Sequence, residues 1–207
     1  MFGGCKEEDF EHRLATILEV TNGQIVVAAE FNCYDIQNCS TFPEQNREKV
    51  LRAFGLNKKE VDGWGAPQLG ATYGCFSSDP SSKCQYKFLN SGFYAGYSKN
   101  VKRFLSMVLD AYKPLGNRHT RRGAKGDQAY IADVFEAHPE MVVLDYAGAL
   151  TNSLSNVKSN EGPFQFQRSR NAWVNSLLKD DACFFHGNGQ GNPVLQDLIN
   201  EQGNATG

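Results

Sequence analysis

The sequence predicts one folded unit of the α/β or α+β class, because strand-like and helix-like segments alternate along the whole chain. The 207 residues fit one domain, given a prior of about 150 residues per domain. Hydrophobic residues make up 41% of the chain and charged residues 21%, which is enough to bury an ordinary core. No internal repeat, low-complexity tract or linker-like stretch divides the sequence, so we expect a single core.

The first elements run from helix to strand to helix. Apolar residues at helical spacing predict a helix over residues 7–19, which Asn22 and Gly23 should stop. The apolar run that follows predicts a buried strand over residues 24–29. Pro43 at its start and Gly55 after its end bracket a short expected helix over residues 44–54.

Later elements keep the same alternation. Residues 86–97 are expected to form a strand pair that is broken at Asn90-Ser91-Gly92. An apolar stripe predicts a helix over residues 100–113. Three further strands and one helix complete the expected set: a helix capped by Asp127, and strands over residues 141–145, 164–167 and 182–185.

Charge and cysteine usage narrow the function classes. The net charge of −2 (21 Lys+Arg against 23 Asp+Glu) excludes the global basic field of a non-specific nucleic-acid binder. No segment approaches the roughly 18 unbroken apolar residues of a membrane span. Six cysteines without a CxxC pair argue against a zinc module. The pairs Cys33/Cys39 and Cys75/Cys84 flank polar loops, which suits disulfides in an oxidising lumen, and six reduced thiols are the alternative.

His186 is the most informative single residue. It follows a buried apolar run and precedes Gly187, Asn188 and Gly189. Function in α/β sheets gathers at the carboxyl ends of strands, where glycines allow a ligand close to the backbone. The pattern indicates a metal ligand or proton-transfer group. The same residues also suit a tight turn.

Four other residues are candidates for a functional role, and each also has a purely structural interpretation. Asp127-Gln128 can orient a polyhydroxylated substrate or simply cap a helix. Asp145 can accept sugar hydroxyls or a metal-bound water, or end a strand in solvent. Trp64 can stack on a sugar face or anchor a loop.

Small polar and basic segments are also candidates. Asn90-Ser91-Gly92 can line a site or form a bulge. The basic loop over residues 118–125 can bind phosphate or lie in solvent. No P-loop, dinucleotide fingerprint or catalytic triad at recognisable spacing is present.

Taken in order, several sequence blocks resemble the glycosyltransferase domain of the procollagen-lysine hydroxylases and related procollagen galactosyl- and glucosyltransferases. The blocks are Ala29-Glu30, Phe88 to Tyr97 with its FLNSG run, Asp127-Gln128, Leu144-Asp145 and His186-Gly187-Asn188-Gly189. The resemblance implies a GT-A fold with a mixed sheet and flanking helices. It implies retaining transfer of a hexose from a UDP-sugar, with Mn²⁺, to a hydroxyl on hydroxylysine or a glycan, in the lumen of the secretory pathway.

The resemblance also implies residue roles. His186 is similar to the family's metal ligand, and Gly187, Asn188 and Gly189 adjoin the nucleotide. Asn90, Ser91 and Gly92 fall at the donor-sugar pocket. Trp64 is a further candidate sugar contact from its own residue type, outside what the resemblance implies. Asp127, Gln128 and Asp145 fall at catalytic positions.

The family's nucleotide-binding half, with its DxxD-type motif, has no counterpart in this sequence. We therefore expect residues 1–207 to be the acceptor-side, C-terminal portion of a hexosyltransferase domain, from an N-terminally truncated gene model or a fragment. The competing interpretation is a non-catalytic lumenal module that binds a glycan or protein. A third is a hydrolase using Asp127 and Asp145 as a carboxylate pair, which requires a separation of about 5 to 9.5 Å.

Overall fold

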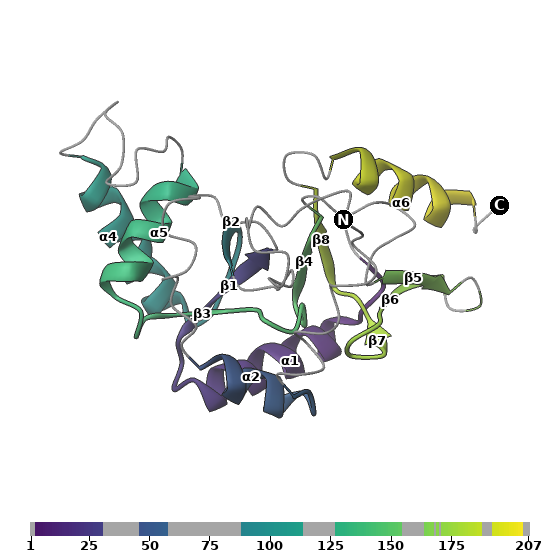
Figure 1. Cartoon of the computed structure of the whole chain (residues 1–207), viewed down its shortest axis with the longest axis horizontal. Coiled ribbons are helices and arrows are strands. Elements are labelled where there is room, and N and C mark those ends of the chain that lie inside the picture. The colour runs from purple at the N-terminus through teal and green to yellow at the C-terminus, as the bar shows by residue number, and fades with distance from the viewer. Residues whose placement is uncertain are drawn as a thin grey trace, which may run out of the picture.

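A computed structural model describes residues 3–30, 46–57, 88–113, 127–154, 164–167, 169, 171–187 and 192–204. Helices and strands alternate along these residues, and both parallel and antiparallel strand pairs occur (Figure 1). The α/β class expected from the sequence is confirmed at this level.

A three-stranded sheet of order β2-β1-β3 forms the centre. Strand β1 (Ile25–Glu30) pairs antiparallel with β2 (Phe88–Ala95) and parallel with β3 (Val142–Leu144). All six residues of β1 are buried, as its unbroken apolar run predicts for a strand covered on both faces. Only the last residue, Glu30, is charged, and its placement decides much of the site.

Strand β2 carries a bulge. Its register against β1 passes from Val27 opposite Tyr94 to Ala28 opposite Asn90, so three residues of β2 are skipped. Residues 88–95 therefore form one strand with a bulge, where a strand pair was expected. The Gly92 N–H donates to Asn90 Oδ1 at 2.8 Å, which bends the chain away from the ladder.

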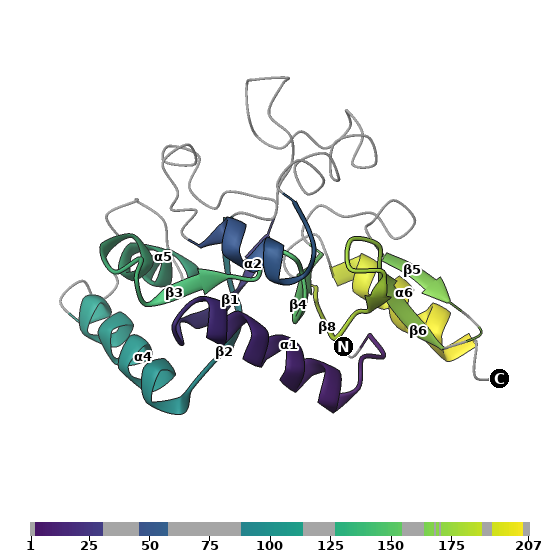
Figure 2. The same cartoon turned by 90° about the horizontal axis from the view of Figure 1, so that it is seen from below.

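In the part of the chain that the structure describes, four helices lie around this sheet. Helices α1 (Glu7–Val20) and α2 (Arg47–Ala53) pack on each other, with α1 against β1. Helices α4 (Ser98–Tyr112) and α5 (Asp127–Ala137) pack together at one end of the molecule, with α5 against β2 (Figures 1 and 2). The helix expected from Asp127 is confirmed.

The opposite end of the molecule holds the later strands and the last helix (Figure 2). Strand β4 pairs in parallel with β8, and β5, β6 and β7 form an antiparallel sheet. The bounds are β4 Thr151–Ser153, β5 Phe164–Gln167, β6 Ala172–Asn175, β7 Asp180–Asp181, β8 Phe184–His186 and α6 Asn192–Asn204. His186 is thus the last residue of a parallel strand.

Two apolar clusters fill the interior of the described residues. The larger one joins the β2-β1-β3 sheet to α1, α2, α4 and α5, and the smaller one lies between Trp173, Phe185 and Leu198. None of the described helices has both the length and the apolar character needed to span a bilayer. The sites of Trp64, the basic loop and four of the six cysteines lie outside the described residues.

Candidate functional site

A buried carboxylate, Glu30, organises a polar cluster where β1 and β2 meet α5. Glu30 is 4% exposed, and both of its carboxylate oxygens accept amide hydrogen bonds. Asn90 Nδ2 donates to Glu30 Oε2 at 3.2 Å, and Gln128 Nε2 donates to Glu30 Oε1 at 2.6 Å. A buried carboxylate is tolerated only with such donors, so Glu30 and the two amides hold one another in place.

The imidazole of His186 joins this cluster from β8. Its Nδ1 lies 2.9 Å from Asn90 Oδ1, although the two residues are 96 positions apart in the sequence. The other hydrogen bonds of Asn90 fix the orientation of its amide, because Nδ2 donates to Glu30 and Oδ1 accepts from the Gly92 N–H. An oxygen in that position can only accept, so His186 Nδ1 carries the proton. The Nε2 lone pair of His186 is then left for another partner, and among the described residues it has none.

Gln128 is oriented in the same way. Its Nε2 also donates to the Leu89 carbonyl at 3.0 Å, and its Oε1 accepts from the Ser91 N–H at 3.5 Å. Both bonds reach the backbone of β2 on either side of Asn90. Gln128 therefore fixes the N-terminal turn of α5 against the start of the bulge.

The negative charge of Asp127 acts on the pKa values of two neighbouring side chains, Tyr94 and His186. Burial, and secondarily Asp127, raises the pKa of Tyr94 to about 12. Burial lowers the pKa of His186 below its ordinary value of 6.5, and Asp127 partly opposes that shift. The imidazole is therefore neutral at physiological pH, which keeps its Nε2 available as an acceptor or ligand.

Gly92 allows the histidine to approach. A Cβ built on Gly92 would overlap the His186 ring at Cε1, Nδ1 and Nε2. The glycine in the bulge is thus required by the packing of the imidazole against the β2 backbone, a reason that spacing in the sequence did not reveal.

Asp145 lies elsewhere and has a structural role. It is fully buried, and its two oxygens accept from the backbone N–H groups of Ala149, Leu150 and Thr151, each at 2.8 Å. Burial raises its pKa to about 6, although the three N–H donors and Arg13 act in the opposite direction. The interpretation of Asp145 as a solvated strand end is wrong. Its use as a substrate acceptor is also unsupported, because the carboxylate is turned into its own loop.

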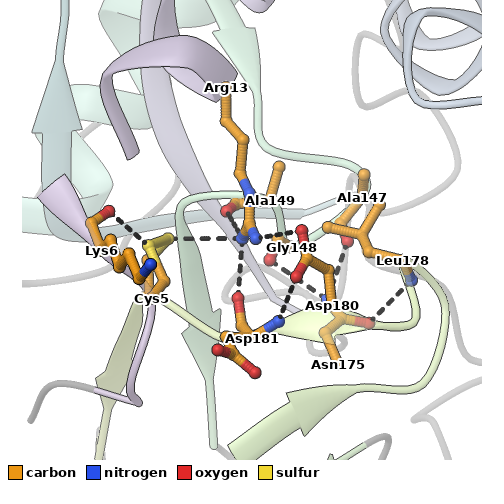
Figure 3. A network of polar contacts seen from close by, with 11 residues as sticks. Cys5, Lys6, Arg13, Ala147, Gly148, Ala149, Asn175, Leu178, Asp180 and Asp181 are labelled. Atoms are coloured by element: carbon orange, nitrogen blue, oxygen red, sulfur yellow. Dashed lines mark hydrogen bonds and ion pairs between the residues drawn. A yellow bond between two sulfur atoms is a disulfide. The ribbon is translucent and has the colours of Figure 1, made fainter. Parts of the chain in front are cut away.

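The loop after Asp145 is held from both sides (Figure 3). Arg13 Nη1 donates to the Ala149 carbonyl at 3.0 Å, and Asn175 Nδ2 donates to the Ala147 and Gly148 carbonyls at 3.2 Å. These contacts leave Asp145 without a place in a cleft shared with Asp127, so the carboxylate-pair hydrolase is not supported.

The predicted site residues thus fall into three groups. Asn90, Ser91, Gly92, Asp127, Gln128 and His186 come together, and Gly187 directly follows His186. Asp145 is apart from them. Trp64, Asn188 and Gly189 lie outside the described residues.

Sequence reasoning missed the central residue. Glu30 entered only as part of a motif, without a role, although it ends an apolar strand just as Asp145 and His186 do. A charged residue that closes a strand buried on both faces must find partners inside the fold, and that signal was available.

The described residues do not assemble a metal site by themselves. No group of three or more His, Cys, Asp or Glu side chains that could hold an ion lies among them. Both Glu30 oxygens already accept amide protons, so His186 Nε2 and the exposed carboxylate of Asp127 are the groups of the cluster that remain for an ion. The expected Mn²⁺ would need further oxygen ligands besides these two groups.

Comparison with known proteins yields no relative. No protein-family model matches the chain, no curated protein matches it, and no solved structure matches it.

Proposed function

We propose that the chain belongs to a glycosyltransferase domain of GT-A type that transfers a hexose from a UDP-sugar to a hydroxyl group. The observation that carries the proposal is the convergence of separate sequence blocks. Glu30, Asn90, Gln128 and His186 are joined by hydrogen bonds although they come from four different elements. The same blocks, in the same order, carry the resemblance to the procollagen-lysine glycosyltransferases.

The chemistry of the cluster supports a sugar-bearing ligand. Amides and carboxylates are the groups that pair with several hydroxyls at once, because they offer donors and acceptors in fixed directions. Glu30 uses its charge to orient Asn90 and Gln128. Exposed Asp127 and half-buried Ser91 and His186 remain to contact a ligand.

In this proposal each residue of the cluster either binds the ligand or orients a side chain that does. The neutral His186 presents Nε2 as an acceptor, and the lone pair is held in place through Asn90 and Glu30. Asp127 accepts from sugar or acceptor hydroxyls. A divalent ion, when bound, would supply charge neutralisation of the leaving diphosphate, and we derive no step through it.

Location in the secretory lumen is part of the proposal. The disulfide between Cys5 and Cys183 supports it, because such bonds persist in oxidising compartments. The proposed partners are the UDP-sugar and a hydroxyl acceptor on a protein or glycan.

Calorimetric titration of the folded chain tests the proposal. We expect UDP-glucose or UDP-galactose to bind in the presence of Mn²⁺, and His186→Ala to weaken binding by about tenfold, the loss expected for one hydrogen bond of about 1 kcal/mol. His138→Ala is the matched control, because His138 is a surface histidine paired only with Glu140 at 3.5 Å among the described residues.

Two outcomes decide against the proposal. Equal binding by wild-type protein and His186→Ala would remove His186 from the site. Binding of an oligosaccharide with no detectable UDP-sugar binding would favour the non-catalytic module instead.

A further inference from the structure

The disulfide Cys5–Cys183 ties the start of the described chain to the strand that carries His186. The two cysteines are 178 residues apart, and Cys183 lies three residues before His186. This pairing was not among those that loop spacing indicated. Its position makes it a covalent connection between the N-terminal segment, residues 3–6, and the candidate site.

Backbone hydrogen bonds reinforce the same connection. Gly3 N–H donates to the Cys183 carbonyl at 2.8 Å and Cys5 N–H to the Ala182 carbonyl at 3.2 Å, while Trp173 N–H donates to the Gly3 carbonyl at 2.7 Å. The N-terminal segment therefore lies between β6 and the residues that lead into β8. The disulfide and these bonds hold the segment there, together with the close packing of Gly3 on Ala182 and Phe185.

The two cysteine residues differ in exposure. Cys183 is 1% exposed, whereas Cys5 is half-buried and its Sγ lies 3.3 Å from the neighbouring Lys6 carbonyl. An attacking thiolate reaches the more accessible sulfur first, so Cys5 is the sulfur that would be attacked and Cys183 the one that would leave.

Arg13 stands beside the leaving sulfur. Its Nη1 lies 3.3 Å from Cys183 Sγ, and the guanidinium is held there by the Ala149 and Asp181 carbonyls at 3.0 and 2.8 Å (Figure 3). Its Nη2 pairs with Asp180 at 2.8 Å, which offsets part of the charge. A fixed cation next to a sulfur stabilises its thiolate and makes it a better leaving group, whereas a purely structural disulfide has no need of one.

From these contacts we propose that Cys5–Cys183 is a thiol–disulfide exchange site, reduced by a protein dithiol, whose state controls the position of His186. A thiolate of the dithiol attacks Cys5 Sγ, the Cys5–Cys183 bond breaks, and its electron pair goes to Cys183 Sγ beside Arg13. The second thiol of the reductant resolves the mixed disulfide and releases Cys5. Two electrons and two protons pass to the protein, and the dithiol is oxidised to a disulfide.

The state of the disulfide determines whether strand β8 is covalently attached to the N-terminal segment. In the oxidised form, strand β8 is tied to the N-terminal segment, and the Leu154 N–H donates to the His186 carbonyl at 2.9 Å. Reduction frees the residues before β8 from their cross-link, which loosens the hydrogen bond between His186 and Asn90. The proposal stands without the glycosyltransferase assignment, because its readout is the histidine itself.

Titration of the folded protein with dithiothreitol tests it. Alkylation and peptide mapping would identify the cysteines reduced, and the ring resonances of His186 would report its environment. We expect reduction of Cys5 and Cys183 while the protein remains folded, a shifted His186 signal, and recovery on reoxidation. Glutathione disulfide added to the reduced protein should form a mixed disulfide on Cys5, from which the Cys183 thiolate displaces glutathione and restores the Cys5–Cys183 bond.

Two variants distinguish a disulfide that undergoes thiol–disulfide exchange from a purely structural cross-link. Asp180→Asn removes the charge that offsets Arg13 at a half-exposed side chain, so reduction should become several-fold faster. Arg13→Gln should slow reduction by about tenfold if it folds. Reduction that occurs only together with global unfolding, an Asp180→Asn rate equal to wild type, or an unchanged His186 signal in the reduced protein would each overturn the proposal.

Discussion

Replacement of Gly92 by alanine is the sharpest test of the site, because the structure defines what the added methyl group meets. The new Cβ would overlap the His186 ring, because the three heavy atoms nearest to it all belong to that side chain. The imidazole must move, which breaks its 2.9 Å bond to Asn90 Oδ1. No positive φ is involved at Gly92, so the cost comes from packing and not from backbone strain.

The magnitude follows from three contributions. Overpacking costs about 1–3 kcal/mol. The lost hydrogen bond costs about 1 kcal/mol. The smaller conformational freedom of alanine in the unfolded chain returns about 0.5–1 kcal/mol. We therefore expect Gly92→Ala to lower the free energy of unfolding by about 2 kcal/mol, as measured by urea denaturation.

The matched control is Gly203→Ala in α6. A Cβ at Gly203 has no atom within 4 Å, and alanine is favoured over glycine in a helix, so this change should stabilise the protein by about 0.5–1 kcal/mol. In a His186→Ala background Gly92→Ala should lose most of its cost, because the ring is gone. An equal cost in both backgrounds would refute the packing of His186 on Gly92.

Two further changes test the buried carboxylates. Glu30→Gln should lower the free energy of unfolding by about 2–3 kcal/mol and shift the His186 ring resonances, because the new amide turns an N–H group toward one of the two side chains that donate to Glu30. The control is Glu48→Gln, which loses only an exposed ion pair. It should cost about 0.5 kcal/mol or less and leave the resonances unchanged. Asp145 has a folded pKa of about 6, above its ordinary 3.8, so its protonated form favours the folded state. That stabilisation, about 3 kcal/mol, is fully present below about pH 4 and is lost as pH rises through about 6. The difference in unfolding free energy between wild type and Asp145→Asn should fall accordingly between pH 4 and 7, and a pH-independent difference would contradict the assigned shift.

Local patterns in the sequence predicted the elements because the information was local. The spacing of Phe10, Leu14, Ile17 and Leu18 gave the first helix, and all six residues of β1 are buried, as expected for a continuous apolar run. His186 was placed correctly at a strand end because apolar residues before it and glycines after it allow little else.

Long-range partners were not predictable from spacing. A carboxylate at the end of a strand looks the same whether it faces solvent, as expected for Asp145, or turns back to bind three backbone N–H groups. Six cysteines allow about 15 pairings, and local loops favoured other pairs than Cys5–Cys183. Both features depend on chain segments that meet only after folding.

The cluster also changes how a mutation in the motif should be interpreted. Glu30, Asn90 and Gly92 have their contacts within the protein, so loss of activity on changing them follows from disorder of His186 under any function. Ser91 and Asp127 are different, because no side-chain hydrogen bond holds them among the described residues. Ser91→Ala and Asp127→Asn should therefore leave stability within about 0.5 kcal/mol of wild type. Weaker UDP-sugar binding in these two variants, at unchanged stability, would separate a ligand-binding role from a structural one, which changes at the three buried positions cannot do.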